Sequence, residues 1–146
     1  MENYIPEVPV NIELNLTNEL LDLGVGETVT IEPDTTNDNF GKLIYPNSRF
    51  KIYNIPWRVF GKGILLYRSG YYEYRAFDRT CTYKPFEEYC AVENKTDMLV
   101  PKCPCCGSKF LLTADGQTTK GSLAIRPLFQ YQTTLINNGT RLVISR

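Results

Sequence analysis

The most informative stretch of the chain reads Cys103-Pro104-Cys105-Cys106-Gly107-Ser108-Lys109-Phe110. It places three of the five cysteines within four positions. Cys103 and Cys106 have the Cys-x-x-Cys spacing, which lets two sulfur atoms on one tight turn face the same point. Pro104 stiffens this turn by fixing its own backbone angle, and Gly107 permits a positive backbone angle or a close approach of the main chain. The stretch therefore predicts a tight turn lined with sulfur.

A second cysteine-bearing element lies upstream. It consists of Cys81-Thr82-Tyr83, and Cys90 follows seven positions after Tyr83. Strand-like segments flank both elements, so we expect two loops that close on one site. The question of function is largely the question of what these two loops hold.

Composition points to one all-β domain that covers residues 1–146. A chain of this length buries roughly 70% of its extended surface and can form a core without additional crosslinks. Its 10 tyrosines, 10 glycines and 9 prolines suit strands joined by frequent turns. Lysine plus arginine equal aspartate plus glutamate at 16 each, which argues against a nucleic-acid binder. No apolar run is long enough to span a membrane.

Histidine is absent from the chain. This excludes a Ser-His-Asp triad, a Cys-His dyad and any histidine-ligated metal site. Nothing in the sequence indicates another catalytic acid, base or substrate pocket. We therefore expect no enzymatic activity of its own.

Hydrophobic alternation predicts the strands. Residues 1–9 contain two prolines and form an extended lead-in, whereas residues 42–60 look like irregular strands and turns. Tyr67 and Tyr74 belong to an aromatic group with Tyr71 and Tyr72, of which we expect alternate members in the core; a stacking surface for sugars or bases is the alternative. The expected strands are 10–16, 28–32, 64–68, 72–77, 98–100, 109–112, 130–136 and 141–145.

Both cysteine loops resemble the cluster loops of Rieske iron–sulfur domains. Residues 78–83, Asp-Arg-Thr-Cys-Thr-Tyr, resemble the first loop with its Cys-x-His motif, and residues 103–110 resemble the second, Cys-Pro-Cys-His-Gly-Ser-x-Phe. The likeness covers about residues 60–146. It continues through Asp115-Gly116, Gly121-Ser122-Leu123-Ala124, Arg126-Pro127-Leu128 and Tyr131.

The whole chain is also similar to Rieske-like lipoproteins that Bacteroidetes export. In such proteins a lipid-bearing leader would precede Met1. This likeness implies a lipid anchor upstream of Met1 and an extracytoplasmic location, either periplasmic or membrane-anchored.

The Rieske resemblance implies a three-sheet antiparallel fold with the cysteine loops at one end. Two cysteines of the family hold one iron and two histidines hold the other. By position, Cys81 and Cys103 match the cysteine ligands, while Tyr83 and Cys106 stand where the histidines should be. Ser108 matches a serine that donates a hydrogen bond to a cluster sulfur. Further disulfide and ligand assignments follow from the same likeness.

In some members of the family, the cysteine that Cys105 matches makes a disulfide between the two loops. Here Cys90 is the candidate partner, several positions later than in the family. The same Cys90 is alternatively the fourth ligand of a metal site, in competition with Tyr83. The sequence leaves this choice open.

Three hypotheses follow for the site. The first is a 2Fe-2S cluster on Cys81, Cys103, Cys106 and either Tyr83 or Cys90, with a low potential because thiolates replace imidazoles. Such a domain would transfer electrons to a redox partner protein that the sequence does not identify. The second is a cluster-free domain in which the cysteines form disulfides in an oxidising compartment, acting as an exported structural or binding module.

The third hypothesis is a zinc site on the Cys103–Cys106 turn. A structural zinc site needs a second pair of ligands, and Cys81 and Cys90 are too far apart in sequence to form a second pair on one turn. Zinc is therefore the weakest of the three hypotheses.

Overall fold

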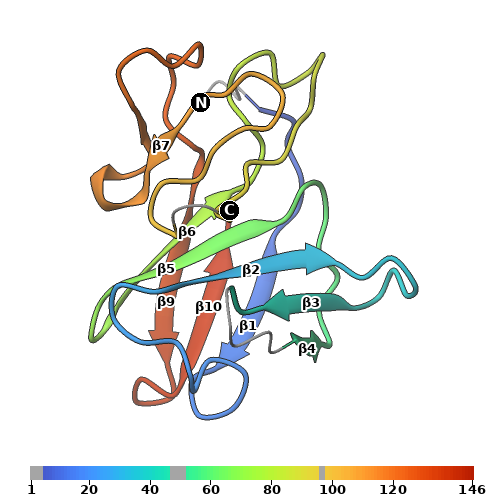
Figure 1. The fold of residues 1–146 in the computed structure, drawn as a ribbon. Helices are drawn as coiled ribbons and strands as arrows, with labels where there is room; N and C mark the ends of the chain where they lie inside the picture. Colours follow the sequence, from blue (N-terminus) through green and yellow to red (C-terminus); the bar gives the residue numbers. More distant parts are fainter. Residues whose placement is uncertain (1–4, 47–51, 96–97) are drawn as a thin grey trace.

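The structure is a computed structural model that describes residues 5–46, 52–95 and 98–146. It confirms the all-β class and consists of antiparallel strands joined by loops (Figure 1). Within the described residues, no helix is both long and apolar enough to cross a lipid bilayer. The elements are β1 (Asn11–Asn15), β2 (Thr28–Pro33), β3 (Gly41–Ile44), β4 (Ile52–Ile55), β5 (Ile64–Gly70), β6 (Glu73–Asp78), β7 (Phe110–Leu111), the 3-10 turn η2 (Leu112–Ala114), β8 (Gln117–Thr118), β9 (Gln130–Ile136) and β10 (Arg141–Ser145).

Eight strands form one large sheet in the order β1-β10-β9-β6-β5-β2-β3-β4. All neighbours in this sheet are antiparallel, and the sheet curls until it is nearly closed. The first and last strands of the chain, β1 and β10, pair with each other, with Asn11 opposite Ser145 and Asn15 opposite Arg141. The short strands β7 and β8 form a separate two-stranded sheet.

The main core lies inside the curled sheet. Alternate residues of each strand point into it, as Ile12 and Leu14 do from β1 and Leu142 and Ile144 do from β10. The residues between them stay wholly or partly accessible. This confirms the predicted period-two pattern of the first and last strands, which is typical of a sheet with one covered face.

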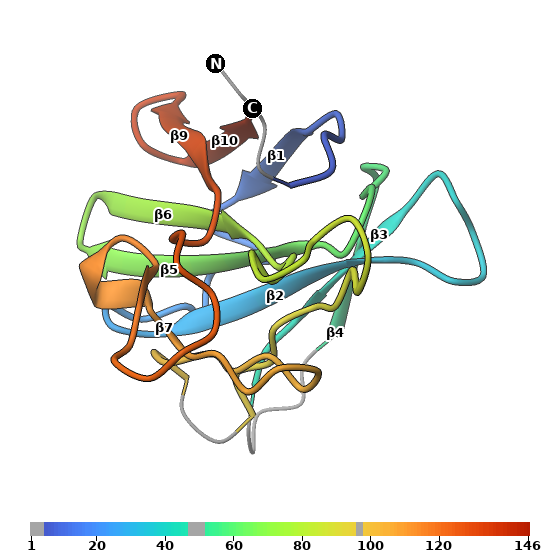
Figure 2. The same cartoon turned by 90° about the horizontal axis from the view of Figure 1, so that it is seen from above.

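Strands β5 and β6 are covered on both faces. Leu66 and Ala76 face the main core, whereas Leu65, Tyr67 and Phe77 pack into a second apolar cluster. This cluster belongs to the part of the molecule that we call the cysteine lobe, residues 79–95 and 98–128. Figure 2 shows the lobe on the side of β5 and β2 opposite to β9, β10 and β1. The lobe members of the cluster are Cys81, Val92, Cys103, Phe110, Leu112, Ala124 and Leu128.

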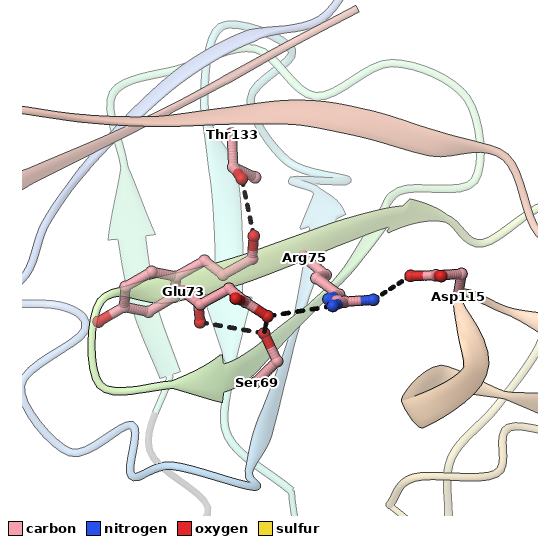
Figure 3. A network of polar contacts seen from close by, with 6 residues as sticks. Ser69, Glu73, Arg75, Asp115 and Thr133 are labelled. Atoms are coloured by element: carbon pink, nitrogen blue, oxygen red, sulfur yellow. Dashed lines mark hydrogen bonds and ion pairs between the residues drawn. The ribbon is translucent and has the colours of Figure 1, made fainter.

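The cysteine lobe contains little regular structure. Besides β7, β8 and η2, its described backbone is tied by isolated bridges between Thr80 and Ala91 and from Lys102 to both Glu93 and Lys109. Polar contacts attach it to the large sheet. Arg75 of β6 forms an ion pair with Asp115 of the lobe and contacts Glu73, whose carboxylate accepts a hydrogen bond from Ser69 (Figure 3).

One sequence prediction about strands was wrong. Residues 98–100 form a turn rather than a strand, with Leu99 partly buried against the lobe cluster and its carbonyl accepting the Leu112 N–H. Residues 42–60, expected to form irregular strands and turns, contain β4 and most of β3. The expectation for the tyrosines is confirmed, because Tyr67 and Tyr74 are buried and Tyr71 and Tyr72 are exposed.

Candidate metal centre

The first cysteine loop begins where β6 ends. Its entry is fixed by Asp78, whose carboxylate accepts hydrogen bonds from the Thr80 backbone N–H at 2.8 Å and from the Tyr131 hydroxyl. Three residues after Asp78, the backbone N–H of Cys81 donates to the Cys90 carbonyl at 2.8 Å. These bonds hold Cys81 close to the end of a rigid strand and tie it to the part of the loop that carries Cys90.

The second cysteine loop is the tight turn that the sequence predicted. The Cys103 N–H donates to the Ser108 carbonyl at 2.8 Å, and the Gly107 N–H donates back to the Cys103 carbonyl at 2.9 Å. Gly107 has φ +77°, and a Cβ atom there would meet nothing within 4 Å. Glycine is therefore favoured at this position by the backbone angle rather than by crowding.

Three thiol sulfurs from the two loops converge. The Sγ atoms of Cys81, Cys103 and Cys106 all lie within 4.8 Å of one another, and Cys81 Sγ is 3.6 Å from Cys106 Sγ. Sulfurs that share one tetrahedral ion lie roughly 3.8 Å apart, given metal–sulfur bonds of about 2.3 Å. The three sulfurs are thus near the spacing that a single shared ion requires, whereas a 2Fe-2S cluster, with two protein ligands on each iron, requires at least one of them to move away from the other two.

The thiols differ in their surroundings. Cys81 and Cys103 are 1% and 0% exposed, while Cys106 is partly accessible. Burial raises the pKa of Cys81, and a hydrogen bond from the Tyr83 backbone offsets only part of this effect. Burial also acts upward on the pKa of Cys106, but hydrogen bonds from Ser108 and the neighbouring thiols outweigh it and lower the pKa. Cys106 is accordingly the more easily ionised of these two residues.

Ser108 lies beneath the sulfurs. It is fully buried, its Oγ accepts the Ala124 N–H at 3.0 Å, and Cys106 Sγ lies 3.1 Å from the same oxygen. The sequence singled out Ser108 but not Thr82, whose hydroxyl donates to the Arg126 carbonyl at 2.7 Å. These two bonds fasten the segment around 124–126 to both cysteine loops. No sequence pattern points to the Thr82 bond, because its acceptor is a backbone carbonyl more than forty positions away.

Cys90 and Cys105 form a disulfide between the two loops, as the family likeness implied. While this disulfide is intact, the Cys90 sulfur is not free to act as a fourth metal ligand. Tyr83, the other candidate, is partly buried against the lobe cluster. The two loops therefore supply three free thiols and one phenol.

This donor set suits a sulfur-loving metal. Three convergent thiolates favour iron–sulfur clusters, zinc or copper(I) over calcium or magnesium, which prefer oxygen. A closed site needs a fourth donor, for which the sequence offered Tyr83 or Cys90. The structure thus brings together three of the four ligands that a thiolate-held metal centre needs.

The surface beside the site is apolar. A shallow depression of about 370 Å³ lies next to Tyr83, between the first cysteine loop and residues 123–126. Three large side chains around it are unusually exposed for their type: Phe86 at 63%, Leu123 at 55% and Ile125 at 88%. Such patches on soluble domains often mark contact surfaces.

Comparison with known proteins adds no relative to this picture. No protein-family model, no curated protein and no solved structure matches the chain.

Proposed function

We propose that the protein is a Rieske-like electron-transfer domain that holds a 2Fe-2S cluster without histidine. Cys81, Cys103 and Cys106 are its thiolate ligands, and Tyr83 is the fourth donor. The observation that carries this proposal is the convergence of the three free sulfurs from two separate loops. Two cysteine-bearing loops at one end of an antiparallel β domain also suit the Rieske-like architecture that the sequence motifs imply.

When bound, the centre supplies the uptake and release of a single electron. The protein residues set the conditions for this chemistry. Ser108 places a hydroxyl beside the sulfur of Cys106, and the lobe cluster keeps water from Cys81 and Cys103. The exposed apolar side chains near Tyr83 offer a redox partner protein a contact surface close to the site. Thiolate ligation places the reduction potential nearer the roughly −400 mV of plant-type ferredoxins than that of histidine-ligated centres.

The test is an analysis of the full chain after anaerobic expression. We expect a coloured protein with about two irons and two acid-labile sulfides per chain, and a visible absorption spectrum that bleaches on reduction. Colourless protein without iron would contradict the proposal. Zinc in place of iron would support the same ligands but exclude electron transfer.

A matched pair of variants tests the fourth ligand. Tyr83→Phe and Tyr89→Phe each remove one phenolic hydroxyl from the same loop, but only Tyr83 occupies the ligand position. We expect Tyr83→Phe to shift the absorption spectrum and lower the iron content, and Tyr89→Phe to leave both unchanged. Equal spectra for the two variants would remove Tyr83 from the ligand set.

A second candidate function is a cluster-free exported module, and one observation favours it. The Cys90–Cys105 disulfide suits an oxidising, extracytoplasmic compartment. In such a compartment Cys81 and Cys106, with sulfurs 3.6 Å apart, would form a second disulfide after small side-chain rotations. Mass measurement before and after reduction distinguishes the cases: two disulfides in iron-free protein support the module, and one disulfide with bound iron supports the carrier.

A further inference from the structure

Cys103 is the point at which the free thiols and the disulfide meet. Its sulfur lies within 4.8 Å of those of Cys81 and Cys106, and also within 4.8 Å of both sulfurs of the Cys90–Cys105 disulfide. Cys81 and Cys106 belong only to the set of three free thiols, whereas Cys103 belongs to that set and also to the set with Cys90 and Cys105. The five cysteine sulfurs thus form one connected set through Cys103, and a thiol so close to a disulfide is placed for exchange with it.

We propose that Cys103 couples metal binding to the position of the disulfide. With metal bound, Cys103 is a ligand and the disulfide joins Cys90 to Cys105. When the metal is lost, Cys103 attacks Cys90, the disulfide moves to Cys90–Cys103, and Cys105 becomes a free thiol at the surface. The metal-bound half of this switch rests on the proposed function; the exchange itself rests on the sulfur positions.

The step conserves atoms and electrons. The Cys103 thiolate donates an electron pair to Cys90 Sγ and forms the new S–S bond, while the Cys90–Cys105 bond breaks. Cys105 Sγ leaves with the electron pair and takes up the proton that Cys103 released. One disulfide and three thiols are present before and after, so the step needs neither an oxidant nor a reductant.

The surroundings favour attack at Cys90. A bond from Cys103 to Cys105 would join residues separated by a single position, which closes a small and constrained ring. Attack at Cys90 instead releases Cys105, which is exposed, so that the leaving thiolate is hydrated. The hydrogen bond from the Cys81 N–H to the Cys90 carbonyl keeps Cys90 beside the thiol group during the exchange.

Bound metal prevents the exchange, because a thiolate that coordinates an ion does not have that electron pair available for attack. Burial has a complementary effect: Cys103 is 0% exposed, so dissolved disulfides do not reach it and the neighbouring sulfurs are its available partners. Loss of the metal is thereby converted into the appearance of one reactive thiol at the surface.

The experiment maps disulfides and free thiols in the full chain. Protein as isolated and protein depleted with an iron chelator under argon are alkylated with iodoacetamide without denaturation, then digested and mapped without reduction. We expect loaded protein to show the Cys90–Cys105 linkage with Cys105 unlabelled. Depleted protein should show the Cys90–Cys103 linkage with Cys105 labelled several-fold more. An unchanged Cys90–Cys105 linkage after depletion would overturn the proposal.

Two variants distinguish the effect of losing the attacking thiol, Cys103, from the effect of losing the metal. Cys81→Ser and Cys103→Ser each remove one metal ligand, but only Cys81→Ser retains the attacking sulfur. We expect several-fold greater labelling of Cys105 in Cys81→Ser, and equal labelling would overturn the proposal. Should either variant fail to fold, as its circular dichroism would show, the wild-type depletion decides.

Iron content, measured on the same wild-type samples, reports on the proposed function independently. Iron-free protein with a Cys90–Cys103 linkage would contradict the carrier and retain the exchange. Iron-loaded protein whose disulfide stays at Cys90–Cys105 after depletion would retain the carrier and contradict the exchange.

Discussion

In the large sheet, apolar side chains alternate along the strands and meet inside one curled layer. In the cysteine lobe, by contrast, regular strands are two residues long, and loops close around a cluster that includes two of the thiols. The lobe has no extended hydrogen-bond ladder among its described residues. It is held instead by a disulfide, by isolated bridges and by packing against the second face of β5 and β6. The large sheet therefore holds the extended core, and the lobe holds the convergent cysteines.

This difference teaches that the lobe depends on the sheet more than the sheet depends on the lobe. Leu65, Tyr67 and Phe77 form the floor on which the cysteine loops pack. The main core, with Ile12, Leu14 and the other inward residues, does not include any lobe residue. Changes at the floor should disturb both regions, whereas changes within the lobe should stay local.

The largest effect is expected for Phe77→Ala. Phe77 is fully buried where β6 meets the lobe cluster, so its truncation removes apolar contact and leaves a cavity, at about 3–5 kcal/mol of unfolding free energy. Urea unfolding measures the loss. Leu142→Ala in the main core is the control: it should also destabilise, by about 2–5 kcal/mol, without increasing alkylation of Cys81 in the folded protein. Equal alkylation of Cys81 in both variants would mean that the two regions are not distinct.

Removing the disulfide should separate the two regions more clearly. Cys90→Ser combined with Cys105→Ser opens a bridge with a sequence separation of 15, for which loop-closure entropy predicts about 3 kcal/mol. We expect amide hydrogen exchange to accelerate more in residues 79–95 and 98–128 than in β1, β9 and β10. Uniform acceleration would show that the lobe and the sheet unfold as one unit.

Two glycines with positive φ allow a paired test. At Gly63, φ is +95° and a Cβ would overlap the Ile31 carbonyl oxygen, a backbone atom of the neighbouring strand. Gly63→Ala combines strain with overlap and should reduce the unfolding free energy by about 2–3 kcal/mol. Gly107→Ala in the cysteine turn meets open space, so strain alone predicts about 1 kcal/mol. Thermal unfolding of both variants measures the difference, and equal shifts would contradict the distinction.

The two regions also differ in how far the sequence predicted them. Alternation identified β1 and β10, whose every second residue faces the core, and the apolar and β-branched runs identified β2, β5, β6 and β9. Residues 98–100 are three apolar residues that form a turn, from which Leu99 packs against the lobe cluster. Periodicity over so short a run cannot distinguish such a turn from a strand. The continuous apolar run of residues 64–67 is typical of a strand buried on both faces, and it could have predicted the covering lobe.

Within the site, the strand-like segments that flank both cysteine loops predicted that the loops would close on one site, and the sulfurs of Cys81, Cys103 and Cys106 do converge. Spacing could not decide whether Cys90 binds metal or pairs with Cys105, because that depends on the path of the loop between Tyr83 and Cys90. The position of Cys103 between the thiols and the disulfide is likewise a matter of three-dimensional distance. The sequence therefore identifies candidate partners for each cysteine, and the three-dimensional distances between the sulfurs decide which of them are in contact.

A smaller effect is expected for Tyr131→Phe, which removes the hydroxyl that binds Asp78 at the entry to the first cysteine loop. The lost hydrogen bond predicts a decrease of about 1–2 kcal/mol in unfolding free energy at pH 7. Burial, and then the neighbouring Asp78, raise the pKa of Tyr131. In the unfolded chain a tyrosine loses its proton near pH 10, before the folded protein does, so wild-type stability should fall as the pH rises above about 10.

Urea midpoints at pH 9 and pH 11 measure this decline, which Tyr131→Phe should make shallower. Tyr71→Phe, at an exposed hydroxyl, is the control and should keep the wild-type slope. A slope unaltered by Tyr131→Phe would show that other buried groups carry the alkaline transition.

The smallest effect is expected at the polar contact that joins the sheet to the lobe, the Arg75–Asp115 ion pair of Figure 3. The two side chains are 30% and 61% exposed, so solvent screens the pair and Arg75→Met should lose about 0.2–1 kcal/mol. The Ser69 hydroxyl and then Arg75 lower the pKa of Glu73. The ionised Glu73 carboxylate therefore stabilises the β5–β6 hairpin at pH values above the ordinary glutamate pKa, and this contribution is lost as the pH falls through the lowered pKa. A double-mutant cycle with Asp115→Asn, measured by urea unfolding at low and high salt, isolates the pair. A coupling above about 2 kcal/mol that resists salt would mean that charge, rather than the floor around Phe77, holds the lobe in place.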